Sequence, residues 1–331
     1  MRINQQKSAC CRAPVWRHGQ KRRQCQACKR TWSVWPAKRG KRAKRPAHNL
    51  LKRYLANKIG SLAAHAEETK LSAQHVQKKV RAARDTQQPS LLWASLPTGP
   101  FILVADGLQQ TFGQITFTVY LQLLRPIDDS QATILPPFML PGKESIGGWY
   151  KTYARIPKTS SDQIRAIVCD GSAGLLDLAN DRGLILQRCH FHFKQSLCNY
   201  LRPGRLSRNP ALAREIHGLV DVILQNSDDE QALSASERLK VDYIPYLANS
   251  KLQTVLRGFC KHWQDYRSYL YYPDLHLPRT SNSAESCVRT IRDLQQRARG
   301  WRTPETFLAW VEVVLKSKQT IVCNESKNPQ K

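Results

Sequence analysis

Two aspartates, Asp106 and Asp170, each follow an apolar segment and precede a glycine. The segments before them, Phe101–Ala105 and Ile164–Cys169, consist almost entirely of apolar residues. Each predicts a buried strand that delivers a carboxylate at its C-terminal end, where the glycine turns the chain. If the two strands pair in parallel, both carboxylates lie at one edge of the sheet. Because two acids repel each other there, a cation between them is favoured, which is the chemistry of a Mg²⁺ site.

A third carboxylate, Glu285, opens a segment with the periodicity of an amphipathic helix. Its apolar face consists of Ala284, Cys287, Val288, Ile291, Leu294 and Ala298. The opposite face carries Glu285 and, at helical spacing, three arginines: Arg289, Arg292 and Arg299. Taken alone, the segment also fits a simpler interpretation. In that interpretation Asn282 and Glu285 form a capping box at the start of the helix, and the arginines are a solvated face.

Other patterns of catalytic residues are absent from the sequence or weaker. There is no dinucleotide-binding glycine motif, phosphate-binding Walker loop or nucleophile elbow. Cys189 and His190 are adjacent, and adjacent side chains seldom orient for proton transfer, so a thiol nucleophile is disfavoured. Four further aspartates are less favoured carboxylates because none ends a buried apolar run: Asp128, Asp129, Asp162 and Asp177.

Four cysteines, Cys10, Cys11, Cys25 and Cys28, lie in a basic segment near the N-terminus. Cys25 and Cys28 have the Cys-x-x-Cys spacing with which two thiolates hold one zinc ion in a tight turn. The other two are adjacent, so His18 is an alternative fourth ligand with one of them left out. A thioredoxin-type redox site is disfavoured because the surrounding basic residues do not predict a βαβ unit. We therefore expect a zinc-ribbon-like structural site.

Residues 48–85 have the pattern of three short helices, and 61–80 have the rhythm of a helix-turn-helix. Ser72 is expected to cap the last helix. The residues expected to face inward or fill the turn are Leu62, Ala63, Ala66, Leu71, Val76 and Val80. The polar residues expected on the outer surface are Gln74, His75, Gln77, Lys78 and Lys79. Glutamine can bond adenine and lysine can meet phosphates or guanine, although a generic three-helix bundle has the same pattern.

The charge of the chain is concentrated at one end. The 331 residues include 52 Lys and Arg against 25 Asp and Glu, a formal net charge of +27. Residues 1–85, which include Lys21, Arg22 and Arg23, account for +20, and the remaining residues for only +7. Because no long amphipathic helix with an aromatic face accompanies the basic run, nucleic acid is favoured over a membrane as the partner.

Three domains are expected from these patterns. They are a basic head and linker at 1–46, the helix-turn-helix at 47–89, and a larger body at 97–331. Within the body, the alternation of apolar residues predicts strands at 114–122 and 184–188 and a helix at 173–181, and 205–278 is mostly helical in pattern. No apolar run approaches the ~18 residues of a membrane span, and no signal-peptide pattern opens the chain, so a soluble intracellular protein is expected.

Together these features resemble the DDE transposases of bacterial insertion sequences, and among them the mutator-like type. Cys189 and His192 match the Cys-x-x-His that this type carries between its second aspartate and its glutamate. Asn282 and Glu285, followed by basic residues, match its Asn-x-x-Glu. The resemblance covers most of the chain. It implies an α/β fold, in which an RNase H-like mixed sheet with a helical insertion at 205–278 follows small zinc-ribbon-like and helix-turn-helix DNA-binding domains. The adjacent Cys10 and Cys11 depart from the spaced pair of the family.

The resemblance also implies roles for individual residues. Asp106, Asp170 and Glu285 would be the catalytic triad that binds Mg²⁺ or Mn²⁺ for strand cleavage and strand transfer. The arginines after Glu285 would hold DNA phosphates, and the roles of Cys189 and His192 stay open. The implied partner is double-stranded DNA, both element ends and target, bound by a homodimer or larger assembly in the bacterial cytoplasm at the nucleoid. Two alternatives are a non-catalytic DNA-binding regulator and an RNase H-like nuclease or resolvase.

Overall fold

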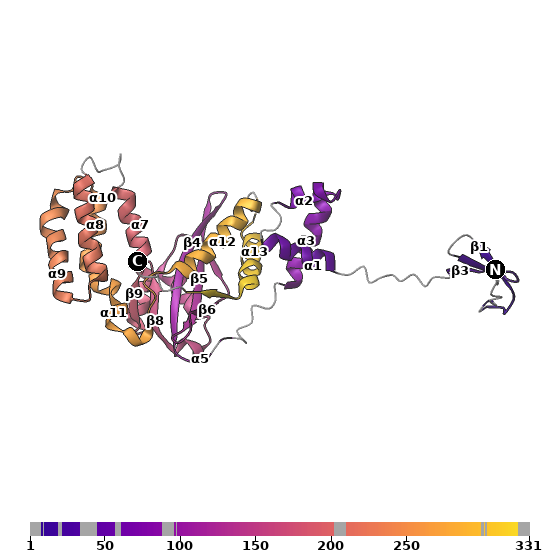
Figure 1. Cartoon of the computed structure of the whole chain (residues 1–331), viewed down its shortest axis with the longest axis horizontal. Coiled ribbons are helices and arrows are strands. Elements are labelled where there is room, and N and C mark those ends of the chain that lie inside the picture. Colours follow the sequence, from indigo (N-terminus) through magenta and orange to yellow (C-terminus); the bar gives the residue numbers. More distant parts are fainter. Residues whose placement is uncertain are drawn as a thin grey trace, which may run out of the picture. The chain divides into compact units, whose positions relative to one another are not determined.

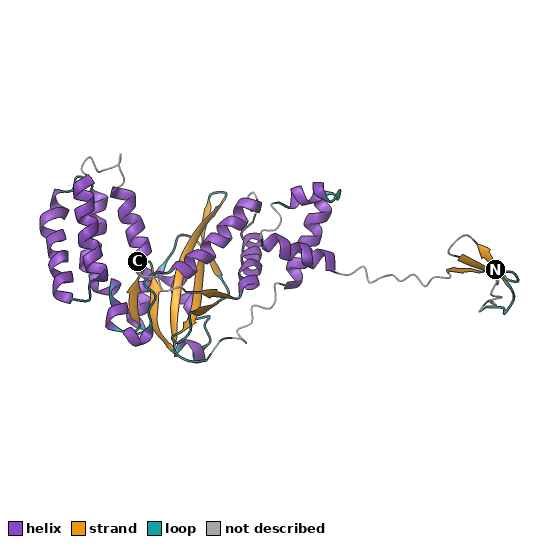
Figure 2. Ribbon diagram, in the orientation of Figure 1, coloured by secondary structure: helices purple, strands orange, loops and turns teal. Residues whose placement is uncertain are grey.

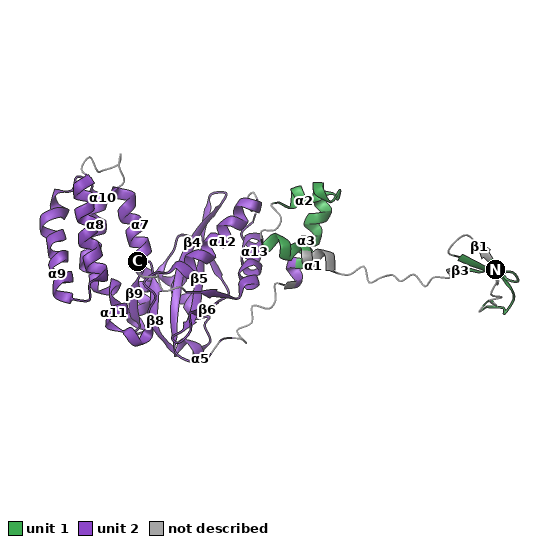
Figure 3. Ribbon diagram, viewed as in Figure 1, with its two compact units in different colours: residues 1–83 green, residues 84–331 purple. Residues whose placement is uncertain are grey.

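The computed structural model describes residues 8, 10–18, 22–33, 45–56, 61–87, 96, 98–201, 210–298, 301 and 303–323 (Figure 1). The chain divides into two compact units, residues 1–83 and 84–331, which are described separately below (Figure 3). The architecture is mixed α/β, with helices around a mixed sheet in the larger unit (Figure 2). Among the described residues, no helix is both long and apolar enough to cross a membrane.

The first unit begins with a small antiparallel sheet. Its three strands are β1 (Val15–His18), β2 (Arg22–Cys25) and β3 (Thr31–Ser33). In the register, Val15 lies opposite Cys25 and Gln24 opposite Thr31. The end of β2 therefore coincides with the first cysteine of the Cys-x-x-Cys segment.

Three helices follow the sheet: α1 (Arg45–Leu55), α2 (Leu62–Glu68) and α3 (Ala73–Gln87), of which α3 passes the boundary of the first unit at Ala83. The predicted cap at Ser72 is present, because its Oγ accepts the His75 N–H at 3.2 Å. Of the predicted inner residues, Ala66, Val76 and Val80 are buried and Leu62 is half-buried, whereas Ala63 and Leu71 are exposed.

The prediction that Leu71 fills the turn is therefore wrong, and the backbone of the turn explains why. Lys70 adopts a left-handed conformation with φ of 54°, and the Leu71 N–H donates to the Ala66 carbonyl at 2.9 Å. A second bond joins the Lys70 N–H to the Glu67 carbonyl at 3.1 Å, which completes a Schellman-type helix end. Backbone bonds close the turn, and the Leu71 side chain remains 42% exposed.

The larger unit is organised around a seven-stranded mixed sheet (Figures 1 and 2). Its strands are β4 (Phe101–Phe112), β5 (Ile115–Pro126), β6 (Gln131–Ile134), β7 (Phe138–Pro141), β8 (Ile164–Cys169), β9 (Ile185–Arg188) and β10 (Thr320–Val322). The order is β10-β6-β5-β4-β8-β9, and β7 pairs with β5. Pairing is antiparallel on the β5 side of β4 and parallel on the β8 side.

The strand that carries Asp106 is longer than predicted. Asp106 does not end β4, which pairs with β5 without interruption from Phe101 to Phe112. On its other side β4 is paired over a shorter length, because its pairing with β8 ends at Val104. Gly107 is consequently part of the strand and not a turn. Gly171 does turn the chain, with φ of 92°, directly after β8 and Asp170.

Helices cover both faces of this sheet. On one face, α4 (Ile146–Tyr153) and α6 (Ala173–Asp181) pack through Trp149 and Leu175 against Leu103 and Ala105 of β4. The helix α6 coincides with the predicted 173–181. Because side chains alternate along a strand, Val104 and Asp106 lie on the other face, where α12 (Asn282–Ala298) contacts β4 and β5. Helix α13 (Pro304–Lys318) contacts β6.

The segment between β9 and α12 forms a helical subregion with a core of its own. Its longer helices are α7 (His190–Leu201), α8 (Pro210–Gln225), α9 (Asp229–Arg238) and α10 (Ser250–Lys261). Shorter helical turns follow up to Leu275, including α11 (Ser268–Tyr271). The short helix α5 (Lys158–Ser161) lies earlier in the chain, before β8. Phe193 and Phe259 stack in this core at 4.1 Å between ring centroids. The predicted helical character of 205–278 is confirmed for the described part, residues 210–278.

Candidate functional site: an acidic sheet edge and a cysteine cluster

The parallel pairing of β4 and β8 brings Asp106 and Asp170 together. The last pair of this register is Val104 opposite Val168. Continued by two residues, the same register places Asp106 beside Asp170, and both side chains on the face that α12 covers. Each carboxylate is held by a local amide: Asp106 Oδ1 accepts the Gly107 N–H at 2.8 Å, and Asp170 Oδ1 accepts the Ser172 N–H at 2.9 Å.

Asp106 is a buried acid, with only 8% of its surface exposed. Burial raises the pKa of its carboxyl to about 7, against the lowering effect of His192, and the charges of Asp170 and Glu144 raise it further. No ion pair among the described residues neutralises Asp106, Asp170 or Glu285. A hard divalent cation would relieve this repulsion, and carboxylate oxygens are the ligands that Mg²⁺ prefers.

Helix α12 carries Glu285 along β4. At its start, the Glu285 N–H donates to the Ser281 carbonyl at 3.0 Å, and further along, Gln295 hydrogen-bonds Gln110 of β4. The charge of Asp106 also acts on the Cys287 thiol, whose pKa is raised mainly by burial. Glu285 is half-buried at the border of the packed face. The predicted apolar face is buried at Ala284, Cys287, Val288, Ile291 and Leu294.

The same helix start contradicts the capping-box interpretation. The Ser281 carbonyl accepts the first helical hydrogen bond, so Ser281 is the N-cap and Asn282 is already the first helical residue. Glu285 is consequently one residue too far along for the reciprocal bond of a capping box. Arg289 and Arg292 are exposed on the side of the helix that carries Glu285, whereas Arg299 lies outside the described residues.

Cys189 and His192 lie next to this acidic site. Cys189 follows β9 directly, is 1% exposed, and donates its N–H to the Cys169 carbonyl at 2.7 Å. Its Sγ accepts the Ser281 N–H at 3.2 Å, and His192 Nδ1 lies 3.4 Å from Ser281 Oγ. A hydrogen bond with Cys189 raises the pKa of His192 to about 9 against the effect of burial, and Asp106 and Asp170 add to the rise.

Glu144 is a fourth acidic group that the sequence reasoning missed. Its Oε1 accepts the Trp149 Nε1–H at 2.7 Å, and a Cβ on Gly107 would lie 2.8 Å from its Oε2. A Cβ at position 107 would therefore crowd the Glu144 carboxylate, and Gly107 lies within β4 and not in a turn. Glu144 does not directly follow an apolar run, because Gly142 and Lys143 separate it from the end of β7 at Pro141.

The four predicted cysteines form one cluster. Their sulfur atoms all lie within 4.8 Å of one another, and Cys10 Sγ is 3.4 Å from Cys28 Sγ. Two turns make this possible. Arg12 and Lys29 adopt left-handed conformations with φ of 51° and 59°, just after each pair of cysteines. The adjacent residues Cys10 and Cys11 thus both contribute a sulfur, and the cluster can hold a metal ion.

The protonation of these thiols suits a cation among them. Backbone hydrogen bonding at Cys28 and the Ser8 hydroxyl lower the pKa of Cys25 to about 6, whereas hydrogen bonding to Cys28 raises the pKa of Cys11 to about 12. Four thiolates cannot ionise together at this spacing without a positive charge, which a metal ion supplies. Four sulfurs are as many ligands as a structural zinc ion takes, so the cluster does not require His18. The side chain of His18 lies outside the described part.

The predicted DNA-contacting residues of the first unit are mostly exposed. On α3, Gln74, His75, Gln77 and Lys78 are exposed, and Lys79 is half-buried. On β2, Arg22 is exposed and Arg23 half-buried, while Lys21 lies outside the described residues. The helix therefore presents the polar surface that the sequence predicted.

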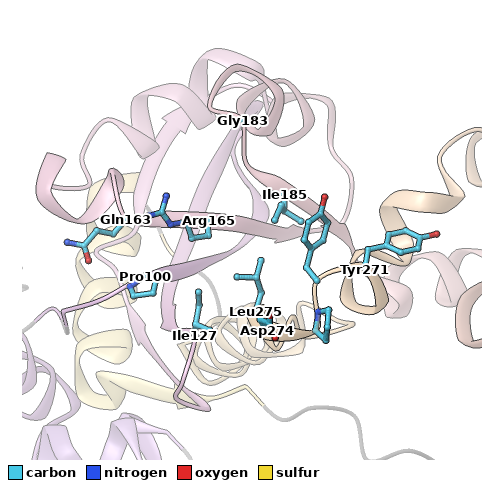
Figure 4. A pocket seen from close by; sticks show the side chains of 11 residues that line it. Pro100, Ile127, Gln163, Arg165, Gly183, Ile185, Tyr271, Asp274 and Leu275 are labelled. Atoms are coloured by element: carbon cyan, nitrogen blue, oxygen red, sulfur yellow. The ribbon is translucent and has the colours of Figure 1, made fainter. Parts of the chain in front are cut away.

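A cavity of about 750 Å³ lies away from the acidic site (Figure 4). Its lining includes Pro100, Arg165 and Ile185, which stand at the beginnings of β4, β8 and β9, together with Tyr271 and Leu275. Asp106 and Asp170 lie toward the other end of the same parallel strands. The cavity is thus separate from the carboxylates.

A scan against protein-family models finds no match for this chain, and a search of curated proteins finds none either. Function is therefore inferred from the residues and their geometry.

Proposed function

We propose that this chain is a DDE-type DNA transposase, which binds the ends of a DNA element, cleaves there, and joins the freed 3′-hydroxyl to target DNA. The observation that carries the proposal is the parallel register that sets Asp106 beside Asp170 on the face covered by the helix of Glu285. Three carboxylates, none of them in a salt bridge among the described residues, are a donor set suited to divalent-metal phosphoryl transfer.

The topology supports an RNase H-like assignment for the catalytic unit. Its core order β6-β5-β4-β8-β9 is antiparallel on one side of β4 and parallel on the other, as expected of such a sheet. Asp106 is then on the central strand, and Asp170 follows its parallel neighbour. The helical subregion would be the insertion that precedes the third carboxylate.

Asp106, Asp170 and Glu285 would hold Mg²⁺ or Mn²⁺, since hard divalent cations take carboxylate oxygens. When bound, such ions activate the attacking oxygen and neutralise charge on the phosphate. The chain itself fixes two of the carboxylates by hydrogen bonds from Gly107 and Ser172. Arg289 and Arg292 would contact DNA phosphates beside the cut, a contact that positions the strand without reading its sequence.

The first unit would recognise DNA. The exposed polar surface of α3 fits the major groove, and the excess of positive charge in residues 1–85 favours phosphate contacts. The cysteine cluster would hold a structural Zn²⁺, because four thiolates gathered within 4.8 Å of one another are a common zinc site. Because an element has two ends, the active assembly would be a homodimer or larger, acting on DNA in the cytoplasm.

The test is Asp170→Asn in a donor-DNA nicking assay with Mg²⁺. Nicking should fall by at least roughly a hundredfold, while DNA binding stays unchanged. Asp177→Asn is the matched control, since Asp177 is an exposed aspartate on α6. Mg²⁺ is best omitted rather than chelated, because a chelator would also strip zinc. Persistent nicking by Asp170→Asn would exclude this active site.

The alternatives give different products. A DNA-binding regulator would bind but never nick, and a nuclease or resolvase would nick without joining a 3′-hydroxyl end to target DNA. An assay with labelled element ends and a supercoiled target separates all three, because only a transposase yields a covalent end-to-target product.

A further inference from the structure

Residues just after β9 hold the residues just before α12. The His190 N–H donates to the Arg279 carbonyl at 2.9 Å, and the Ser281 N–H donates to Cys189 Sγ at 3.2 Å. His192 Nδ1 adds a contact with Ser281 Oγ at 3.4 Å. We name these five residues the 189–281 clamp. The clamp joins positions that are about ninety residues apart in the chain.

Both sides of the clamp are tied to the acidic site. On one side, the Cys189 N–H extends the sheet by bonding the carbonyl of Cys169, the residue before Asp170. On the other side, Ser281 is the N-cap of α12, and its carbonyl accepts the Glu285 N–H. The clamp is therefore a short hydrogen-bonded path from Asp170 to Glu285.

The chain between the two halves of the clamp is long. The helical subregion occupies it, packs around its own core of residues such as Phe193 and Phe259, and would not by itself determine where α12 begins. A joint at the sheet edge does so, because it fixes the first turn of α12 against the end of β9.

We infer that Cys189 and His192 are positioning residues, which hold the start of α12 so that Glu285 stays in register with Asp106 and Asp170. This inference rests on the proposed function, because only there do Glu285, Asp106 and Asp170 act together as metal ligands. Cys189 acts as a hydrogen-bond acceptor for the Ser281 N–H. Because Ser281 is fully buried, water cannot replace Cys189 as the acceptor. His192 supports the same residue through its side chain.

Local opening of α12 tests the clamp without any assay of activity. Amide hydrogen exchange is measured by mass spectrometry on peptides spanning 279–286 in the full chain. Cys189→Ala should accelerate exchange there roughly tenfold, because it leaves a buried N–H without an acceptor. Cys198→Ala is the matched control, since Cys198 is exposed on the same helix α7 and should change nothing.

Cys189→Ser separates the acceptor role from simple packing. Serine and alanine have similar volumes, so a packing role predicts equally fast exchange in both variants. An acceptor role predicts that serine stays close to the wild type, because its Oγ can still take the Ser281 N–H. Equal exchange in the two variants, or no acceleration in either, would overturn the clamp. If Cys189→Ala does not fold, the pair His192→Ala and His192→Asn applies the same comparison, since asparagine keeps a side-chain donor.

Metal binding then tests the consequence for Glu285. In calorimetric titrations with Mn²⁺ in the absence of DNA, Cys189→Ala should bind several-fold more weakly than Cys189→Ser or Cys198→Ala. The Mg²⁺ concentration for half-maximal nicking should rise by a similar factor. Faster exchange with unchanged Mn²⁺ affinity would overturn the positioning role. If the wild type itself neither binds Mn²⁺ at this site nor nicks DNA, the proposed function fails, while the exchange data still decide whether the clamp exists.

Discussion

Replacing Asp106 with asparagine is expected to stabilise the metal-free protein, and to do so more at high pH than at low pH. Burial raises the pKa of Asp106 from 3.8 to about 7, and nearby acids add to this rise. In the unfolded chain the group loses its proton near its ordinary pKa. Folding at higher pH must therefore either restore the proton or bury a charge. Stability falls as the pH rises from about 4 to about 7 and is constant above that.

The size of this effect follows from the two pKa values. At about 1.4 kcal/mol for each tenfold change in proton affinity, the cost is up to about 4 kcal/mol at pH 8 and about 1.5 kcal/mol at pH 5. Asparagine has nearly the same shape as aspartate and no charge, so the variant avoids this cost at both pH values. The gain from Asp106→Asn should thus grow by about 3 kcal/mol between these pH values, roughly 6–12 °C in Tm for a unit of this size.

The assay is thermal unfolding of the full chain, wild type and variant, in Mg²⁺-free buffer at both pH values. Asp177→Asn serves as the control, because an exposed aspartate should show no such pH dependence. Adding Mg²⁺ at pH 8 should stabilise the wild type and leave Asp106→Asn unchanged. A gain from Asp106→Asn that is the same at pH 5 and pH 8 would refute the assignment of Asp106 as a buried, unneutralised acid.

Three further predictions concern other parts of the chain. Gly147→Ala should stabilise α4 by up to about 1 kcal/mol, whereas Gly148→Ala should lower Tm, because its Cβ would lie 2.0 Å from the Tyr120 hydroxyl. Arg289→Ala with Arg292→Ala should weaken DNA binding and reduce the slope of log affinity against log salt by about 2, measured by fluorescence anisotropy. Chelation should release one Zn²⁺ per chain and unfold the β1–β3 sheet, measured by metal analysis and hydrogen exchange. Equal Tm shifts for the two glycine variants, an unchanged salt slope, or a sheet that survives metal loss would contradict these predictions.

Local sequence patterns were sufficient for most of the features that local interactions determine. The helix at 173–181, the cap at Ser72 and the inward positions Val76 and Val80 follow from periodicity and capping, which act over a few residues. The strands before Asp106 and Asp170 follow from apolar runs. The wrong prediction that Leu71 fills the turn also concerns a local feature. It arose because Lys70 adopts a left-handed conformation, which is rare for lysine and is not indicated by the residue type.

Contacts between segments that are distant in the sequence could not be predicted from these local patterns. Nothing in the sequence near Asp106 indicates that β4 continues past it, because the length of β4 depends on its pairing with β5. The approach of Glu144 to Gly107 likewise joins segments that only the packing of α4 brings together. The prediction that Gly107 turns the chain is wrong for this reason, since Gly107 lies within β4.

The sequence by itself determined which residues can do chemistry: two aspartates after apolar runs, a glutamate on an arginine-bearing helix, and four cysteines in a basic segment. The tertiary structure alone decided how they are arranged. Parallel register sets Asp106 beside Asp170, two left-handed turns gather the four sulfurs, and hydrogen bonds tie Ser281 to Cys189 across the helical subregion. The physical reason is that residue type and spacing encode local conformation. Contacts between distant segments depend on the packing of the whole unit.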